Sequence, residues 1–191
     1  MENKNIENDE MHVCPWWLAY TFDNALRRLV DPAGDALKEW VRPGMTVMDF
    51  GCGFGHYALG AARIVGDNGK VIAVDFQEKM LEIMMKRALK AEVDKIIVPH
   101  KCGAHDIGYE GMVDFVVAGN VMHETSDIQK VFNSVFSILN PKGVFFFTEP
   151  RYHVKADFFE RELEAAEKAG FKVTELPLTL GARRACLVKG D

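Results

Sequence analysis

The sequence predicts one α/β domain with a doubly wound, mostly parallel seven-stranded sheet that ends in an antiparallel hairpin. Three observations support this fold class. Short apolar runs alternate with amphipathic segments, as buried strands and their covering helices do. A glycine-rich turn over residues 51–55 joins the first such strand to the helix that follows it. The last two apolar runs follow each other with no helical segment between them, which is typical of a hairpin at a sheet edge.

Hydrophobic patterning places the elements in order along the chain. Strands are expected at residues 46–50, 71–75, 95–99, 113–118, 144–148, 171–176 and 183–189. Helices are expected within residues 15–30 and at 34–41, 56–65, 78–91, 126–139 and 157–169. Ser126, with Gln129 three residues later, has the spacing of a capping box and predicts where the helix before the fifth strand begins. A turn at residues 140–143 is expected to end that helix.

The chain divides into an N-terminal segment, residues 1–43, and a core, residues 44–191. The N-terminal segment begins as a polar, acidic tail and becomes unusually aromatic after Cys14. Tyr20, Asn24 and Arg27 fall on one helical face. A face of that kind favours a helical lid over a ligand pocket, with packing on the sheet as the plainer alternative.

Composition limits the classes of partner. The 23 basic and 28 acidic side chains give a formal charge of −5, and no basic stripe is present, so we expect no nucleic-acid partner. The chain start has no apolar signal region, and no window is apolar enough for a membrane span. Its four cysteines are far apart, which suits reduced thiols in the cytoplasm. We expect no membrane association and no metal site.

The glycine-rich turn has an acidic partner one strand later. Gly51, Gly53 and Gly55 follow the first strand directly, and Asp75 ends the second strand, 20 residues after the last glycine. Glycines allow a tight turn and a close approach of a ligand to the backbone. A carboxylate at the end of the next strand can accept both hydroxyl groups of a ribose. Together they predict a nucleoside site, whereas glycines alone could simply serve a tight turn.

The spacing also indicates which nucleoside is bound. A dinucleotide fingerprint requires its third glycine at position 56, where this chain has His56. Asp49 precedes the turn by two residues. A carboxylate there would repel a diphosphate but would suit the ammonium and sulfonium groups of S-adenosylmethionine.

The segment D-F-G-C-G-F-G, followed by V-I-A-V-D-F, resembles the first two motifs of class I S-adenosylmethionine-dependent methyltransferases. The resemblance covers roughly residues 44–189 and implies a Rossmann-like methyltransferase fold. The stretches D-F-Q-E-K-M-L, V-D-F-V-V-A-G-N-V-M-H and L-N-P-K-G are similar to the small-molecule branch that includes quinone-biosynthesis enzymes.

By position, the resemblance implies the residues that contact S-adenosylmethionine, or S-adenosylhomocysteine as its product. These are Asp49, Gly51, Cys52, Gly53 and Gly55 at the methionine end, Asp75 at the ribose, Phe76, Met80, Ala104 and His105 at the adenine, and Asn120 near the sulfonium. One feature departs from the family: where an acid often precedes the adenine edge, this chain has Gly103. Asp106 or the backbone is expected to make that contact instead.

Acceptor-side residues are expected where the fourth and fifth strands end. His123 is either a base or a residue that orders its loop, and Glu149 either a base or a hydrogen-bonding anchor. His153 is expected at the surface, and Tyr20 near the sulfonium. Short loops and the acidic charge favour in-line methyl transfer to a small-molecule acceptor, with a protein acceptor still open. The alternatives are a non-catalytic donor-binding partner or regulatory module and, less favoured, an NAD(P)-dependent oxidoreductase.

Overall fold

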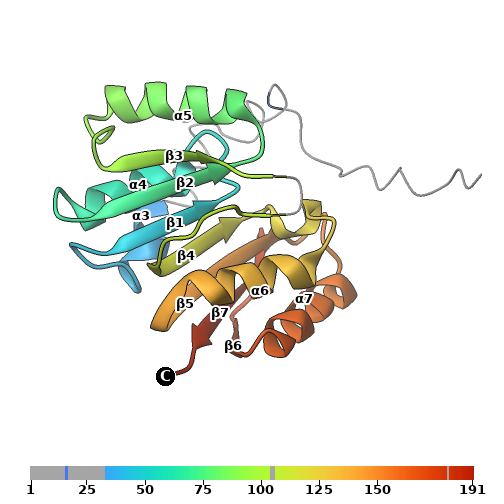
Figure 1. Ribbon diagram of the computed structural model, residues 1–191. Helices are drawn as coiled ribbons and strands as arrows, with labels where there is room; N and C mark the ends of the chain where they lie inside the picture. Colours follow the sequence, from blue (N-terminus) through green and yellow to red (C-terminus); the bar gives the residue numbers. More distant parts are fainter. Residues whose placement is uncertain (1–15, 17–32, 104–105, 180) are drawn as a thin grey trace, which may run out of the picture.

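The computed structural model describes residues 16, 33–103, 106–179 and 181–191. In this part of the chain, seven strands form one sheet in the order β3-β2-β1-β4-β5-β7-β6 (Figure 1). The strands are β1 (Thr46–Phe50), β2 (Lys70–Asp75), β3 (Ile97–Lys101), β4 (Val113–Gly119), β5 (Leu139–Pro150), β6 (Phe171–Leu176) and β7 (Ala182–Lys189). β7 alone runs opposite to the other six strands, so the predicted fold class is confirmed.

Helices cover both faces of the sheet (Figure 1). The described helices are α3 (Ala33–Lys38), α4 (His56–Val65), α5 (Glu78–Lys90), the 3₁₀ turn η1 (Met122–Glu124), α6 (Ile128–Ile138) and α7 (Ala156–Lys168). The core on one face includes residues of α3, α4 and α5, and the core on the other includes residues of α6 and α7. Chain direction across the sheet reverses between β1 and β4, and a doubly wound sheet binds its ligand at the carboxyl ends of the strands flanking such a point.

The two cores differ in the size of their side chains. On the α6–α7 face, Phe132, Phe145, Phe147 and Phe159 are fully buried. On the other face, α4 presents mainly small residues, among them Ala58, Gly60, Ala61 and Ala62. Small residues allow a helix to approach a sheet closely, so the start of α4 is held tightly against the end of β1.

Two predicted boundaries on the α6–α7 side are wrong. The helix there begins at Ile128, and its capping residue is Asp127 rather than Ser126, because the Asp127 carboxylate accepts the backbone N–H of Lys130 at 2.9 Å. Residues 139–143 belong to β5 because Leu139 already pairs with Val113, with an irregularity in register before Phe115. A local turn signal cannot reveal pairing with a strand 26 residues away.

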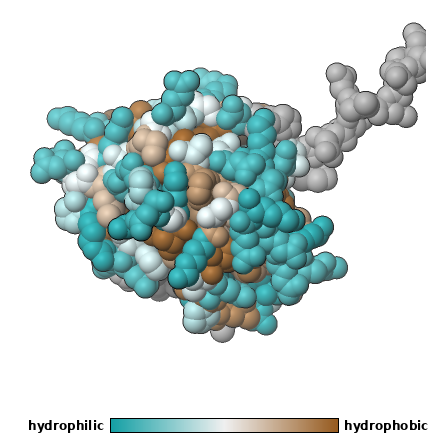
Figure 2. Space-filling view, turned by 60° about the horizontal axis from the view of Figure 1, so that its bottom comes forward, coloured by the Kyte–Doolittle hydropathy of each residue, from teal (hydrophilic) through white to brown (hydrophobic). Residues whose placement is uncertain are grey.

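The sheet edge at β6 carries hydrophilic side chains. Lys172, Thr174 and Glu175 are exposed along this strand, and charges on an edge strand disfavour pairing with another chain. Figure 2, viewed with this side turned forward, shows hydrophobic side chains in the middle of the face and hydrophilic ones around them. Among the described residues, no helix has both the length and the hydrophobicity needed to cross a membrane.

Candidate functional site

The three glycines of the turn after β1 have different surroundings. All three have positive φ angles: 69° at Gly51, 50° at Gly53 and 84° at Gly55. A Cβ atom at Gly51 would lie 2.4 Å from Cγ2 of Val121, and one at Gly55 would lie 2.6 Å from Cγ of Met84. A Cβ atom at Gly53 would meet no atom within 4 Å. Packing thus requires Gly51 and Gly55, whereas Gly53 faces open space that a ligand can enter.

Asp75 contacts this turn directly. Its Oδ2 accepts the backbone N–H of Gly53 at 2.9 Å, and its Oδ1 accepts that of Gln77 at 2.8 Å. Burial raises the pKa of Asp75, although the N–H groups of Gln77 and Gly53 act in the opposite direction. The N–H of Phe76 also acts on this carboxylate, and at least one further lone pair remains for a ribose hydroxyl. The carboxylate and the open glycine position therefore adjoin each other, which is the arrangement expected of a nucleoside site.

Asp49 and Cys52 are almost completely buried beside the turn. The Asp49 carboxylate accepts the backbone N–H of Ala58 at 2.7 Å and so caps the first turn of α4 from the preceding strand. A negative charge is favourable at a helix N-terminus. Burial, followed by the charges of Asp49 and Asp75, raises the pKa of the Cys52 thiol well above its ordinary range, so Cys52 stays protonated.

The predicted adenine contacts are described only in part. The Phe76 side chain, next to Asp75, is 42% exposed, and Met80 is buried at the start of α5. Ala104 and His105 lie outside the described residues. Asp106, the expected substitute for the missing acid, accepts the backbone N–H of Gly108 at 3.0 Å.

The end of β4 brings the acceptor-side residues next to the glycine turn. Asn120 has a φ of 58°, and its N–H donates to the carbonyl of Thr148 at 2.8 Å. The next residue, Val121, is the one that packs on Gly51. Because η1 begins immediately afterwards, His123 lies two residues after Val121, whose side chain contacts the glycine turn.

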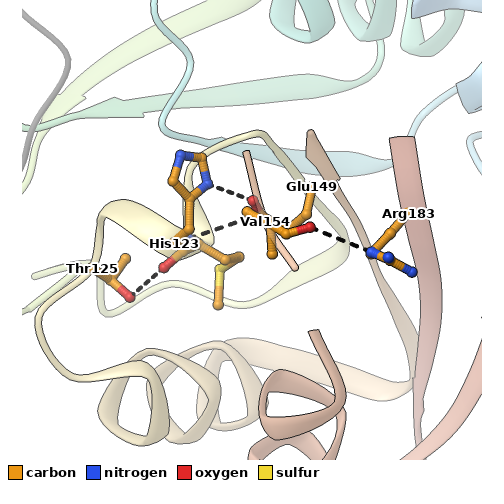
Figure 3. Close-up of polar contacts among 6 residues, drawn as sticks. His123, Thr125, Glu149, Val154 and Arg183 are labelled. Atoms are coloured by element: carbon orange, nitrogen blue, oxygen red, sulfur yellow. Dashed lines mark hydrogen bonds and ion pairs between the residues drawn. The ribbon is translucent and has the colours of Figure 1, made fainter. Parts of the chain in front are cut away.

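His123 and Glu149 form a hydrogen-bonded pair (Figure 3). Nδ1 of His123 bonds to Oε2 of Glu149, and the backbone N–H of His123 donates to Oε1 at 3.3 Å. The Glu149 side chain is fully buried, whereas that of His123 is 14% exposed. Glu149 thus fixes both the backbone and the ring of His123. Tyr20, the other predicted acceptor-side residue, lies outside the described residues.

The protonation of His123 follows from this pairing. Burial alone would lower the pKa of His123, but the hydrogen bond and the charge of Glu149, together with the charge of Glu124, outweigh it and raise the pKa. A carboxylate at Nδ1 keeps a proton on that nitrogen. Nε2 of the neutral ring is then a proton acceptor, which is the geometry that general-base chemistry needs.

Two neighbours of this pair were not expected from the sequence. The His153 ring, exposed as predicted, packs edge-on against the His123 ring with centroids 5.1 Å apart. Glu162 of α7 is fully buried. A signal for Glu162 exists in the sequence, because it follows Phe159 by three residues and precedes Ala166 by four, on the apolar face of its helix.

The part of the chain that the structure describes contains no group of three or more His, Cys, Asp and Glu side chains able to hold a metal ion. Open space at Gly53, the adjoining Asp75 carboxylate and the half-exposed Phe76 ring fit a nucleoside with an extended substituent. Fold and site together define a Rossmann-like methyltransferase, with S-adenosylmethionine as the cofactor that the family uses.

Comparison with known proteins supports the same family. A family model described as "Methyltransferase domain" matches residues 42–178, so the chain belongs to this family and the predicted resemblance is confirmed. A demethylmenaquinone methyltransferase of Lactococcus lactis is 37% identical over 101 residues, covering 52% of this chain and 40% of that protein. A second one, from Symbiobacterium thermophilum, is 31% identical over 54% of this chain and 42% of its own length. The chain thus matches less than half of each of these relatives.

Solved structures share the fold. A SAM-dependent methyltransferase from Aquifex aeolicus superposes with a TM-score of 0.83 at 23% identity, over 92% of this chain and 99% of that one. A putative rRNA methylase from Clostridium thermocellum has a TM-score of 0.66 at 18% identity, over 84% of this chain and 96% of that one. At these identities, the likeness establishes the fold alone.

Proposed function

We propose that this chain transfers the methyl group of S-adenosylmethionine to a small-molecule acceptor by in-line displacement. The observation that carries the proposal is the hydrogen bond from the Gly53 N–H to the Asp75 carboxylate. It joins the open glycine position to the predicted ribose-binding acid in one site. The family match and the quinone methyltransferases among the relatives support the same activity.

The donor is held by residues from the ends of β1, β2 and β4. Asp75 binds the ribose, and Phe76 and Met80 pack on the adenine together with residues 104–105. The turn over residues 49–55 holds the methionine end, with Gly53 admitting it, and the backbone at Asn120 approaches the sulfonium. When bound, the cofactor supplies a methyl group that its positively charged sulfur already activates. The protein therefore needs mainly to align the acceptor and to exclude water.

His123 acts as the general base towards an acceptor that loses a proton. Its Nε2 accepts that proton, while Glu149 keeps the other ring proton on Nδ1 and stabilises the charged ring that results. An arrangement in which His123 only ordered its loop would not need a fully buried carboxylate at Nδ1. Glu149 thus orients the base, in keeping with the anchoring alternative.

The N-terminal segment completes the pocket as a lid in this proposal, with Tyr20 near the sulfonium. The described residue Trp16 supports it, because its backbone N–H donates to Oε1 of Gln77 at 3.2 Å. This contact places Trp16 beside the residue that follows Phe76. The formal charge of −5 favours a small acceptor over a nucleic acid.

Incubation of the chain with methyl-labelled S-adenosylmethionine and a protein-free metabolite extract tests this function. The expected result is S-adenosylhomocysteine together with a labelled small molecule. His123→Gln should abolish most of the transfer, whereas the matched control His153→Gln, at the exposed neighbouring ring, should preserve it. Firm binding of S-adenosylhomocysteine without transfer to any pool would instead support a donor-binding module. Thermal protection by NAD but not by S-adenosylhomocysteine would support an oxidoreductase.

A further inference from the structure

Glu162 is a carboxyl group in an apolar interior. It lies on the buried face of α7 between Phe159 and Ala166 and is 0% exposed. Neither of its carboxyl oxygens has a hydrogen-bond partner among the described residues. Burial of a polar group without such a partner is unfavourable, and perturbed carboxyl groups concentrate at functional sites. The charge of Glu149, which is hydrogen-bonded to the proposed base His123, acts on this carboxyl group.

Glu162 and Glu149 lie on facing surfaces of α7 and β5. Glu149 follows Phe147 by two residues and shares its face of the strand, and Glu162 follows Phe159 by three residues on its helix. The rings of Phe147 and Phe159 are in contact, with centroids 5.5 Å apart. Burial, and then the charge of Glu149, raises the pKa of Glu162 to about 9, although Arg161 acts in the opposite direction. Glu162 is therefore protonated at neutral pH.

Few other charged groups act on this cluster in the described part of the chain. Arg161, on the same helix, is the cation that acts on Glu162, and the charge of Glu124 from η1 acts on His123. Arg183 of β7 stands opposite Glu149 in the strand register, but its Nε–H donates to the carbonyl of Val154 at 3.4 Å. The His153 ring, which packs on the His123 ring, is exposed to solvent. The Glu149 charge is thus shared mainly between His123 and Glu162.

We propose that Glu162 is a positioning residue that keeps a proton beside Glu149, so that one negative charge, and not two, faces His123. This inference rests on the proposed role of His123 as the base. A protonated carboxyl group carries no charge of its own, and its O–H dipole can disperse part of the Glu149 charge although no hydrogen bond joins the two carboxyl groups. The pKa of His123 is then lower than it would be beside the Glu149 carboxylate alone. The ring therefore stays neutral down to a lower pH, with its proton on Nδ1 and with Nε2 free to accept a proton. Without that O–H dipole, the Glu149 carboxylate acts on His123 alone and holds it in the charged form, which cannot accept a proton.

The test is a titration of His123 by NMR in the histidine-labelled chain of residues 1–191, with no methyl donor or acceptor present. His123→Gln identifies the signal, and the nitrogen shifts report which ring nitrogen carries the proton. Glu162→Gln keeps a neutral donor and should leave the His123 pKa and tautomer unchanged. Glu162→Leu removes the donor and should raise the His123 pKa by about half a pH unit or more. Glu162→Met is a second apolar variant, and circular dichroism checks the folding of each.

Two results would overturn the inference. A lower His123 pKa in Glu162→Gln would mean that Glu162 is charged in the native protein. Equal titrations in the native chain, Glu162→Gln and both apolar variants would mean that Glu162 has only a packing role. Neither result depends on methyl transfer, so the proposed function would stand or fall separately, by the labelled-donor experiment with His123→Gln.

Discussion

Gly53→Ala separates ligand binding from folding, with Gly44→Ala as the matched control. Both glycines have positive φ angles, 50° and 84°, and a Cβ atom at either would meet nothing within 4 Å. The substitutions therefore introduce similar backbone strain and no clash within the protein. They differ in place, because Gly53 donates to Asp75 in the proposed donor site, whereas Gly44 lies before β1 at the opposite end of the sheet.

The expected cost in stability is similar for the two variants. A side chain in the left-handed region costs roughly 1–2 kcal/mol, and each kcal/mol lowers the melting temperature of a chain of this size by about 2–4 °C. The expected cost in affinity is not similar. A methyl group at Gly53 occupies the space that the cofactor enters, so Gly53→Ala should weaken binding at least tenfold, which is about 1.4 kcal/mol or more.

Urea denaturation of the ligand-free variants gives the free energy of unfolding, and calorimetry with S-adenosylhomocysteine gives the affinity. Gly44→Ala should bind like the native chain despite its lower stability. If Gly53→Ala bound S-adenosylhomocysteine as tightly as Gly44→Ala does, the open space at Gly53 would not be the ligand site, and the assignment of the turn would be refuted.

Three further predictions concern the α6–α7 side of the sheet. Because the pKa of Glu162 is raised to about 9 in the folded state, its contribution to stability is lost as pH rises from the unfolded-state pKa towards that value. The free energy of unfolding of Glu162→Gln should therefore increase, relative to that of the native chain, by up to about 1.4 kcal/mol per pH unit between roughly pH 5 and 9. If urea denaturation gave the same pH dependence of this free energy for both proteins, a neutral Glu162 would be contradicted. Asp127→Ala should lose about 1 kcal/mol of stability. A larger loss of stability in Ser126→Ala than in Asp127→Ala would show that Ser126 is the capping residue. The rate of methyl transfer to a protic acceptor should increase as pH rises through the raised pKa of His123. Transfer by His123→Gln should be slower by about 10²-fold or more. A rate that changed neither with pH nor with this substitution would exclude His123 as the base.

The elements that local chemistry determines agree between sequence and structure. The helix at residues 56–65 has the predicted limits, because Gly55 and Gly66 both adopt positive φ angles at its ends. The contact between the glycine turn and Asp75 could also be predicted, since parallel strands bring their carboxyl ends to one edge. These features depend on periodicity and on residues close together in the sequence.

The features that could not be predicted depend on distant contacts. Pairing of Leu139 with Val113 turns an expected loop into part of β5. Gly51 is required because Val121 packs against it. The glycine motif alone does not show whether a glycine is needed for such packing or for the approach of a ligand. The environment of Glu162 follows from the way α7 lies over β5, and an amphipathic pattern shows only that the residue faces inward.

The proposed function requires that Asp75 and the glycine turn bind the same adenosine. Calorimetric titration of Asp75→Asn with S-adenosylhomocysteine tests this most directly. The control is Asp114→Asn, because Asp114 also accepts two N–H groups, from Thr46 at 2.9 Å and Asn140 at 2.8 Å, but lies at the start of β4. Hydrogen bonds to a charged group contribute about 1.5–3 kcal/mol, so Asp75→Asn should lose at least tenfold in affinity while Asp114→Asn binds normally. Native affinity in a folded Asp75→Asn variant would contradict a ribose-binding role for Asp75 and, with it, the proposed donor site.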